Sequence, residues 1–250
     1  MSCSEPQIKI RVNNLTKRFG DLTVLDKICF DIKRGELVAI VGPTGCGKTT
    51  FLNTLSKLMP ATEGDILIDG EEANPRKHNI SYVFQEPTCL PWRTVRDNVA
   101  YGMEVKGVPY KERMARTDSI MELVGLSSCA ALYPNQVSAS MIQRIAVSRA
   151  FAVEPDLLLM DEPYGQLDVK LRYYLEDELI SLWQKLQSTV LFVTHNIEEA
   201  VYVAERILVL SNKPTQVKAE ISVDLDRPRN FLDPKFMEIR HQVTELIRWW

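Results

Sequence analysis

The chain has 250 residues, a formal net charge of −3, 45% hydrophobic residues and 25% charged residues. This length and balance predict one large globular domain, or a core with an inserted subdomain, and exclude a disordered chain. The slight negative charge argues against a protein that binds nucleic acid by electrostatic attraction.

The first 42 residues contain runs that alternate between apolar and polar side chains. IKIRV, LDKICFDI and ELVAI predict antiparallel strands beside a main sheet. Apolar runs at 36–42, 80–84, 156–161, 189–194 and 206–211 predict the main sheet itself, which is expected to be mainly parallel because several runs are apolar almost throughout. Helical patterns lie between them, at 48–59, 169–187 and 197–205.

The interval from about Glu86 to Phe151 holds helical patterns and no convincing strand. We therefore expect an α/β fold with a mostly helical subdomain inserted in its core. The core with its insert is expected to span 1–226. The remaining segment, 227–250, reads as a proline-containing linker and a helix that ends in Trp249 and Trp250.

The cysteines and the apolar runs indicate whether the chain is intracellular, secreted or membrane-spanning. The five cysteines are scattered without a C-x-x-C pair, which is typical of reduced thiols and not of a disulfide framework or a zinc site. The N-terminal MSCSEPQIKIRV lacks an apolar signal core, and no apolar run approaches the ~20 residues that a membrane span needs. We expect an intracellular chain that reaches a membrane only through a partner.

The sequence GPTGCGKT lies between a predicted strand and a predicted helix, and it matches the phosphate-binding pattern G-x-x-x-x-G-K-[ST]. Glycines let backbone N–H groups curl around phosphate oxygens, and the following helix points its positive end at the same anion. Lys48 would reach the β- and γ-phosphates, and the Thr49 hydroxyl would bind Mg²⁺. The predicted nucleotide-binding loop comprises Gly42, Pro43, Thr44, Gly45, Cys46, Gly47, Lys48 and Thr49.

Three further predicted strands end in polar side chains. Asp161 and Glu162 end DLLLMDE, His195 ends TVLFVTH, and Gln85 follows ISYVF. Because ligands of open α/β sheets bind at the carboxyl ends of the strands, these residues are expected beside the phosphate loop. Asp161 would hold Mg²⁺ through water, Glu162 would polarise an attacking water, and His195 would contact the γ-phosphate. The alternative for a lone histidine is a structural role.

These motifs in this order resemble the nucleotide-binding subunits of ABC transporters over essentially the whole chain. GPTGCGKTT is similar to the Walker A loop, which adds Thr50 to the ATP-binding residues, and LLLMDEP is similar to Walker B. Gln85 resembles the Q-loop residue, which implies contacts with ATP and Mg²⁺. Asp168 ends a GQLD segment similar to the D-loop, THNIEEA is similar to the H-loop, and Phe19 lies where the family stacks an aromatic ring on adenine.

The segments VFQEPTCLPWRTVRDNVAYGMEVKG and DEPYGQLD are most similar to importers of nitrate, sulfonate, taurine and related solutes. The resemblance implies an ATPase, with Lys48, Glu162 and His195 as catalytic residues, that powers a transmembrane permease from the cytoplasmic face of a bacterial membrane. Its other partners would be a second ATPase subunit and, indirectly, a periplasmic or lipoprotein solute-binding protein, with no nucleic acid. The surface around Pro91 and Trp92 would receive a short helix of the permease.

One segment departs from the family pattern. Where the family reads L-S-G-G-M-R-Q-R, this chain reads VSASMIQR, so that Ser138 and Gln143 remain while Ala139 and Ser140 replace two glycines. In the family this signature loop reaches across a head-to-tail dimer to the γ-phosphate on the opposite subunit. The added side-chain atoms would crowd that approach and impair hydrolysis of the partner's ATP. The alternative is that Ala and Ser are small enough, with Ser140 supplying a donor.

An impaired signature predicts either a heteromeric assembly with one working site or a homodimer with slow hydrolysis. A regulatory nucleotide-binding subunit of low turnover is a second function that fits this sequence. A non-transport ABC ATPase is a third, and the short chain without a coiled coil or basic arm argues against it.

Overall fold

A computed structural model describes residues 7–165 and 167–248, and its main sheet has six strands in the order β10-β9-β3-β8-β7-β6. Five of these strands are parallel, and β10 pairs with β9 in the antiparallel sense. The predicted α/β class and the mainly parallel sheet are confirmed. The strands are β3 (Leu37–Val41), β6 (Ile80–Val83), β7 (Leu157–Asp161), β8 (Thr189–Val193), β9 (Arg206–Leu210) and β10 (Val217–Ser222).

A second, four-stranded sheet is antiparallel throughout and has the order β2-β1-β4-β5. Its strands are β1 (Ile8–Phe19), β2 (Leu22–Lys33), β4 (Glu63–Ile68) and β5 (Glu71–Glu72). The antiparallel strands predicted from IKIRV and LDKICFDI are confirmed. The antiparallel prediction for ELVAI is wrong, whereas the prediction that 36–42 belongs to the main sheet is confirmed. Leu37–Val41 forms β3, which pairs in parallel with β8 and β9.

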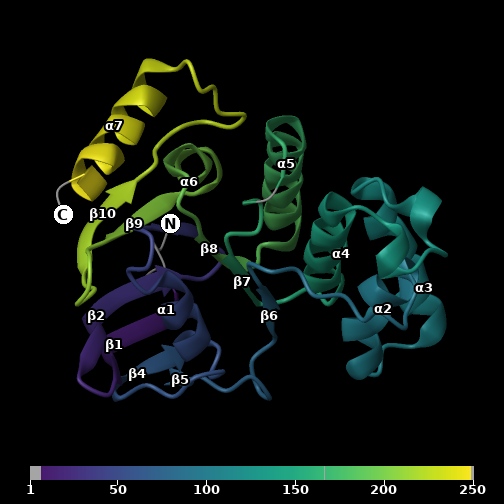
Figure 1. Ribbon diagram of the computed structural model, residues 1–250, viewed down its shortest axis with the longest axis horizontal. Coiled ribbons are helices and arrows are strands. Elements are labelled where there is room, and N and C mark those ends of the chain that lie inside the picture. Colours follow the sequence, from purple (N-terminus) through teal and green to yellow (C-terminus); the bar gives the residue numbers. More distant parts are fainter. Residues whose placement is uncertain (1–6, 166, 249–250) are drawn as a thin grey trace, which may run out of the picture.

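The main sheet lies between two layers that together bury both of its faces (Figure 1). On one face, Val38 and Ile40 join a core with β1, β2 and α1 (Lys48–Leu55). On the other face, Leu37 and Ala39 join a core with α5 (Val169–Leu186), α6 (Ile197–Val203) and α7 (Pro234–Arg248). This two-sided burial explains why strands β3, β7 and β8, which are buried at every position, are apolar except for Thr189 and Asp161.

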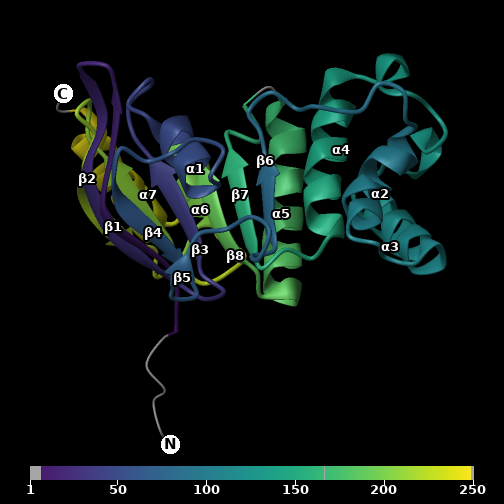
Figure 2. The ribbon, with the colours of Figure 1, turned by 90° about the horizontal axis from the view of Figure 1, so that it is seen from below.

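A helical part with its own small core stands at one end of the molecule (Figure 2). It contains α2 (Val95–Val105), α3 (Tyr110–Leu123), two short 3₁₀ turns (Ser127–Cys129 and Pro134–Gln136) and α4 (Ala139–Ala152). One side of α4 contributes Ile145 to this small core, and the other side contributes Val147 and Phe151 to the core of the main sheet. Helix α4 is therefore the packed link between the two parts.

The segment after β10 is tied to the end of α6. The Arg229 guanidinium donates hydrogen bonds to the carbonyls of Val201 at 2.8 Å and Tyr202 at 3.0 Å, and Arg227 donates to Tyr202 and Val203. These carbonyls belong to the last turn of α6, where no further helical N–H groups reach them. Phe231 stacks on the Tyr202 ring at 4.8 Å between centroids. Trp249, Trp250 and Gln166 of the GQLD segment lie outside the described residues.

In the part of the chain that the structure describes, no helix combines the length and the apolar character that a bilayer crossing requires.

Helix α1 is shorter than the predicted 48–59. It ends at Leu55 because Lys57 adopts a left-handed backbone with φ 60°, which a continuing helix excludes.

One carboxyl group in α5 is buried without a hydrogen-bond partner. Glu176 is fully buried, and neither of its carboxylate oxygens finds a partner within the described ranges 7–165 and 167–248. Burial, and then the negative charge of Glu199, raise the pKa of Glu176 from 4.5 to about 8. The folded chain thus keeps a proton that the unfolded chain releases, so stability falls as the pH rises from 4.5 toward 8.

We expect the substitution Glu176→Gln to remove this loss of stability, because an amide has no proton to release in this range. The gain in the free energy of unfolding over the native chain should grow by up to ~2 kcal/mol between pH 6.5 and pH 8. Urea denaturation at both pH values measures it, with the exposed Glu122→Gln of α3 as the matched control. An equal gain at both pH values would show that Glu176 does not titrate in this way.

Candidate functional site

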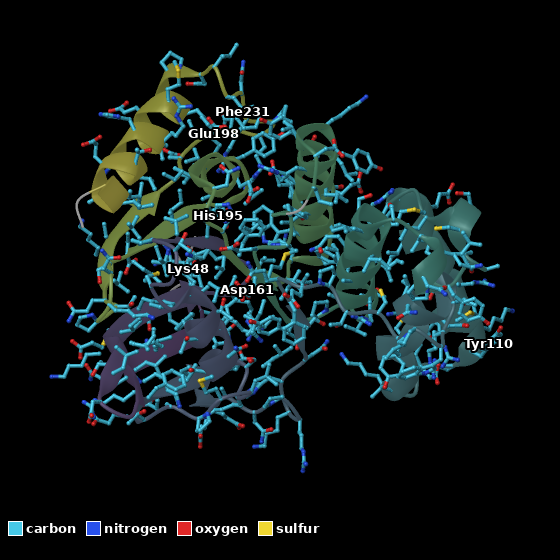
Figure 3. The ribbon with its side chains drawn as sticks, in the orientation of Figure 1. Lys48, Tyr110, Asp161, His195, Glu198 and Phe231 are labelled. Atoms are coloured by element: carbon cyan, nitrogen blue, oxygen red, sulfur yellow. The ribbon has the colours of Figure 1, made fainter. Side chains whose placement is uncertain are left out.

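Three neighbouring strands bring the predicted site residues to one edge of the sheet. Ile40 of β3 pairs with Val193 of β8, and Asp161 of β7 pairs with the same Val193. The phosphate loop therefore begins beside the point where β7 delivers Asp161 and β8 leads into His195. In Figure 3, Lys48, Asp161 and His195 lie together near the centre of the molecule.

The phosphate loop depends on glycine where it turns into α1. Gly45 and Gly47 have φ of 78° and 116°, a region that side chains with a Cβ rarely adopt. A Cβ on Gly47 would also lie 2.8 Å from Cγ1 of Val24. The buried Lys48 ammonium folds back over the loop and donates to the carbonyls of Gly42 at 3.0 Å and Pro43 at 3.1 Å. These contacts hold a positive charge at the point where a phosphate would enter.

Glu162 is the centre of a polar network drawn from three strand ends. Its Oε2 accepts a hydrogen bond from Gln85 Nε2 at 3.2 Å and lies 3.0 Å from His195 Nδ1. Its backbone N–H donates to Val193 O at 2.8 Å, and its φ of 46° is left-handed. A non-glycine residue in this region stores strain, which the surrounding contacts maintain. The carboxylate is thus fixed in place by residues following β6 and β8.

Asp161 and Thr49 form the second polar pair of the site. Asp161 is buried, and burial raises its pKa, although a hydrogen bond with the Thr49 side chain opposes the rise. A hydroxyl, a carboxylate and the Gln85 amide are the oxygen ligands that Mg²⁺ prefers. No group of three His, Cys, Asp or Glu side chains that could hold a metal occurs within 7–165 and 167–248. A magnesium ion here would need phosphate or water oxygens to complete its shell.

A cavity of about 550 Å³, a size usual for small-molecule sites, opens above these residues. Most of the predicted nucleotide residues line it: Phe19, Thr44, Gly45, Gly47, Lys48, Thr49, Thr50, Gln85, Glu162 and His195. Gly42, Pro43 and Cys46 are not among the lining residues, and a Cβ on Gly42 would contact Cys46 and Leu210 behind the loop. The sequence prediction missed Leu22, Val24 and Lys213, which also line the cavity.

The predicted signature residues lie apart from this cavity, at the start of α4. The Ser138 hydroxyl accepts from the backbone N–H of Met141 at 3.3 Å and lies 2.9 Å from the Ser140 hydroxyl. Ala139 and Ser140 are ordinary helical residues without positive φ. The backbone of this segment therefore requires no glycine, and only an approaching ligand could be crowded by the two side chains.

Gln143 and Asp168 act locally in this single chain. The buried Gln143 amide donates to the carbonyl of Pro163, directly after Glu162, so α4 is joined to the Walker B segment. The Asp168 carboxylate accepts from the Leu171 N–H at 3.0 Å and caps α5. Neither residue lines the 550 Å³ cavity.

Comparison with known proteins identifies the family. Residues 25–165, more than half of the chain, match the family model described as ABC transporter. The chain belongs to the ABC transporter family. It is 39% identical to an ABC transporter ATP-binding protein of Methanocaldococcus jannaschii, over 97% of this chain and 92% of the relative. Like other ABC ATP-binding proteins, it is an ATPase.

Two further likenesses extend along most of this ABC ATPase. The taurine import ATP-binding protein of Rhizobium johnstonii is 38% identical over 92% of this chain and 91% of the relative. A solved dimeric ATP-binding cassette, in a post-hydrolysis state bound to ADP and Pi, superposes with a TM-score of 0.78 and 31% identity. That match covers 87% of this chain and 100% of the other.

We expect Gly47→Ala to weaken ADP binding by roughly tenfold or more, because the new Cβ would strain the left-handed turn and collide with Val24. Calorimetric titration with ADP measures the affinity. Gly107→Ala is the matched control, since Gly107 has φ 73° but no neighbour within 4 Å of a built Cβ. Unchanged ADP affinity in Gly47→Ala would contradict the close fit of the loop.

Proposed function

We propose that this ABC ATPase is the ATP-hydrolysing subunit of an importer for a small solute of the nitrate, sulfonate or taurine type. The observation that carries the proposal is the Glu162 carboxylate, held by Gln85 and His195 at the edge of the cavity that contains Lys48. The solute class rests on the likeness to the taurine import protein, which extends over most of both chains.

ATP would lie along the cavity with its base on Phe19, which is 47% exposed and has the Lys17 ammonium over its ring, 5.0 Å from the centroid. Its phosphates would lie in the loop from Gly42 to Thr50. The Lys48 ammonium would exchange its two carbonyl acceptors for phosphate oxygens. Thr49, Gln85 and, through water, Asp161 would hold Mg²⁺, which neutralises charge on the phosphates.

Hydrolysis would begin with water positioned by the Glu162 carboxylate. The water oxygen attacks the γ-phosphorus, the bond to the β–γ bridging oxygen breaks, and the water proton passes to Glu162. His195 contacts Glu162 through Nδ1, which leaves Nε2 for the γ-phosphate oxygens. Lys48 stabilises the charge on the ADP that leaves. Inorganic phosphate is the other product.

A second ATPase subunit would complete each site. Ser138 and Ala139 are exposed at the start of α4 and, with Ser140, lie outside this chain's own cavity, which supports a role toward a partner's ATP. Gln143 and Asp168 would support that role from within the chain, through Pro163 and the start of α5. The solved neighbour is described as dimeric, which supports the same arrangement. The pair would be either a homodimer or a heterodimer with a subunit whose signature keeps its glycines.

The permease would dock beside Gln85. A second cavity of about 450 Å³ there is lined partly by Leu58, Met59 and Phe84, and Trp92 nearby in sequence is 72% exposed. Apolar and aromatic side chains of this kind suit the insertion of a short partner helix. Through the permease the chain would lie at the cytoplasmic face of a membrane and act indirectly with a solute-binding protein.

We propose 1–226 as the ATPase domain, with about 86–151 as its helical subdomain, and 227–250 as linker and terminal helix.

We expect Glu162→Gln to lower ATP turnover by about a hundredfold or more, because the amide cannot accept the water proton. ATP affinity should stay within about twofold of the native value, since the amide preserves the shape of the cavity. Phosphate release measures turnover, calorimetry measures affinity, and the exposed Glu238→Gln of α7 is the control. Turnover above a tenth of the native rate would exclude Glu162 as the general base.

A low-turnover regulatory subunit is the second candidate, favoured by Ala139 and Ser140. We expect the pair Ala139→Gly and Ser140→Gly to raise turnover by about tenfold or more, because it frees the approach of the helix to the partner's phosphate. Ala115→Gly, at an exposed position of α3, controls for the helix-weakening effect of glycine. Equal and brisk turnover in the native chain and the variant would mean that Ala139 and Ser140 serve as well as glycine.

A further inference from the structure

Lys213 lines the same cavity as Lys48, although no motif includes it. Its side chain is exposed, and it enters no ion pair or side-chain hydrogen bond within the described residues. Lys48 and Lys213 are the two lysines among the lining residues. The cavity therefore contains a second ammonium group without an acidic partner.

The loop that carries Lys213 is attached to the phosphate loop and to β2. The hydroxyl of the fully buried Thr215 donates to the carbonyl of Cys46 in the phosphate loop. The Thr215 backbone N–H donates to Val24 O at 2.9 Å, and its carbonyl accepts from Asp26 N–H at 2.9 Å. Lys213 is thus two residues from an anchor that contacts both the phosphate loop and β2.

The Lys213 ammonium lines the same cavity as the phosphate loop and adds to the positive charge there. Burial raises the pKa of the Cys46 thiol, and the charges of Lys48 and of Lys213 oppose that rise. Two positive charges therefore act on the same segment of the loop. Leu22 and Val24, the other lining residues that no motif includes, are apolar and suit the base and sugar of a nucleotide. The positive charge of Lys213 suits its anionic phosphates instead.

We propose that Lys213 is a further nucleotide-binding residue, whose ammonium pairs with the phosphate chain of the nucleotide bound in this cavity. This inference rests on the proposed function, since it needs a nucleotide in the site. A lysine ammonium is a hydrated point charge on a flexible stem, so it pairs with phosphate oxygens without fixed geometry. An exposed pair of this kind is weakened by salt. Lys213 lies outside the Glu162 network and would strengthen binding without changing the chemical step.

The test compares the native chain with Lys213→Met, Lys213→Arg and the control Lys111→Met, which removes an exposed charge on α3. Calorimetric titrations with ADP and with adenosine, at low and high salt, give the affinities. We expect Lys213→Met to weaken ADP binding roughly fivefold at low salt and less at high salt, with adenosine binding unchanged. Lys213→Arg keeps most of the affinity, because it keeps the positive charge.

Each contrary result has a separate meaning. If the native chain binds no ADP, the proposed function fails. If the native chain binds ADP and Lys213→Met binds it equally well, the inference about Lys213 is wrong while the proposed function stands. Parallel losses for ADP and adenosine would also overturn it, because a phosphate contact cannot affect adenosine. Melting temperatures of all variants, with Lys213→Gln as a second neutral substitution, separate lost binding from lost folding.

Discussion

The parallel pairing of β3, β8 and β7 is the constraint on which the nucleotide site depends. Val193 faces both Ile40 and Asp161, so the three strands finish at the same level and deliver the phosphate loop, Asp161 and His195 to one edge. Both faces of these strands are buried, and alternate residues of β3 belong to different cores. A slip of one residue would exchange the two sets of side chains and misplace every site residue at once. Packing of the sheet and position of the chemistry are therefore determined together.

The site holds charges in positions that are costly until nucleotide arrives. Lys48 is only 6% exposed, and the carbonyls of Gly42 and Pro43 are neutral hydrogen-bond acceptors for its buried ammonium. Phosphate oxygens would replace those carbonyls with anionic acceptors, which bind an ammonium more strongly. Glu162 has a left-handed backbone, and its carboxylate is fixed by contacts with Gln85 and His195. In the proposed reaction, prearranged groups of this kind would need little reorganisation as charge develops on the γ-phosphate.

Sequence reasoning succeeded where a local pattern has one structural meaning. Apolar runs such as Leu157–Asp161 predicted buried parallel strands, and the phosphate loop was recognisable from its glycines and its lysine. ELVAI was misassigned because a five-residue run fits both an alternating and a fully buried strand. Strands β4 and β10 were missed because most of their side chains are exposed and several, such as Glu63 and Glu220, are charged, so neither strand forms an apolar run. Lys213 could not be found in this way, since only the folded contact between Thr215 and Cys46 brings it to the cavity.

The altered signature acquires its meaning from how firmly α4 is held. The first N–H groups of a helix have no helical acceptor, and Ser138 occupies only that of Met141. In the proposed dimer, the neighbouring N–H groups would be available to a phosphate, flanked by the methyl of Ala139 and the hydroxymethyl of Ser140. Gln143 ties the helix to Pro163 O, and Arg144 ties it to Val124 O at 2.9 Å. If a phosphate were crowded at its start, α4 could move away only by shifting the segment after Glu162 and the end of α3 as well. In the proposed dimer, the cost of the two side chains would fall on closure around the partner's ATP.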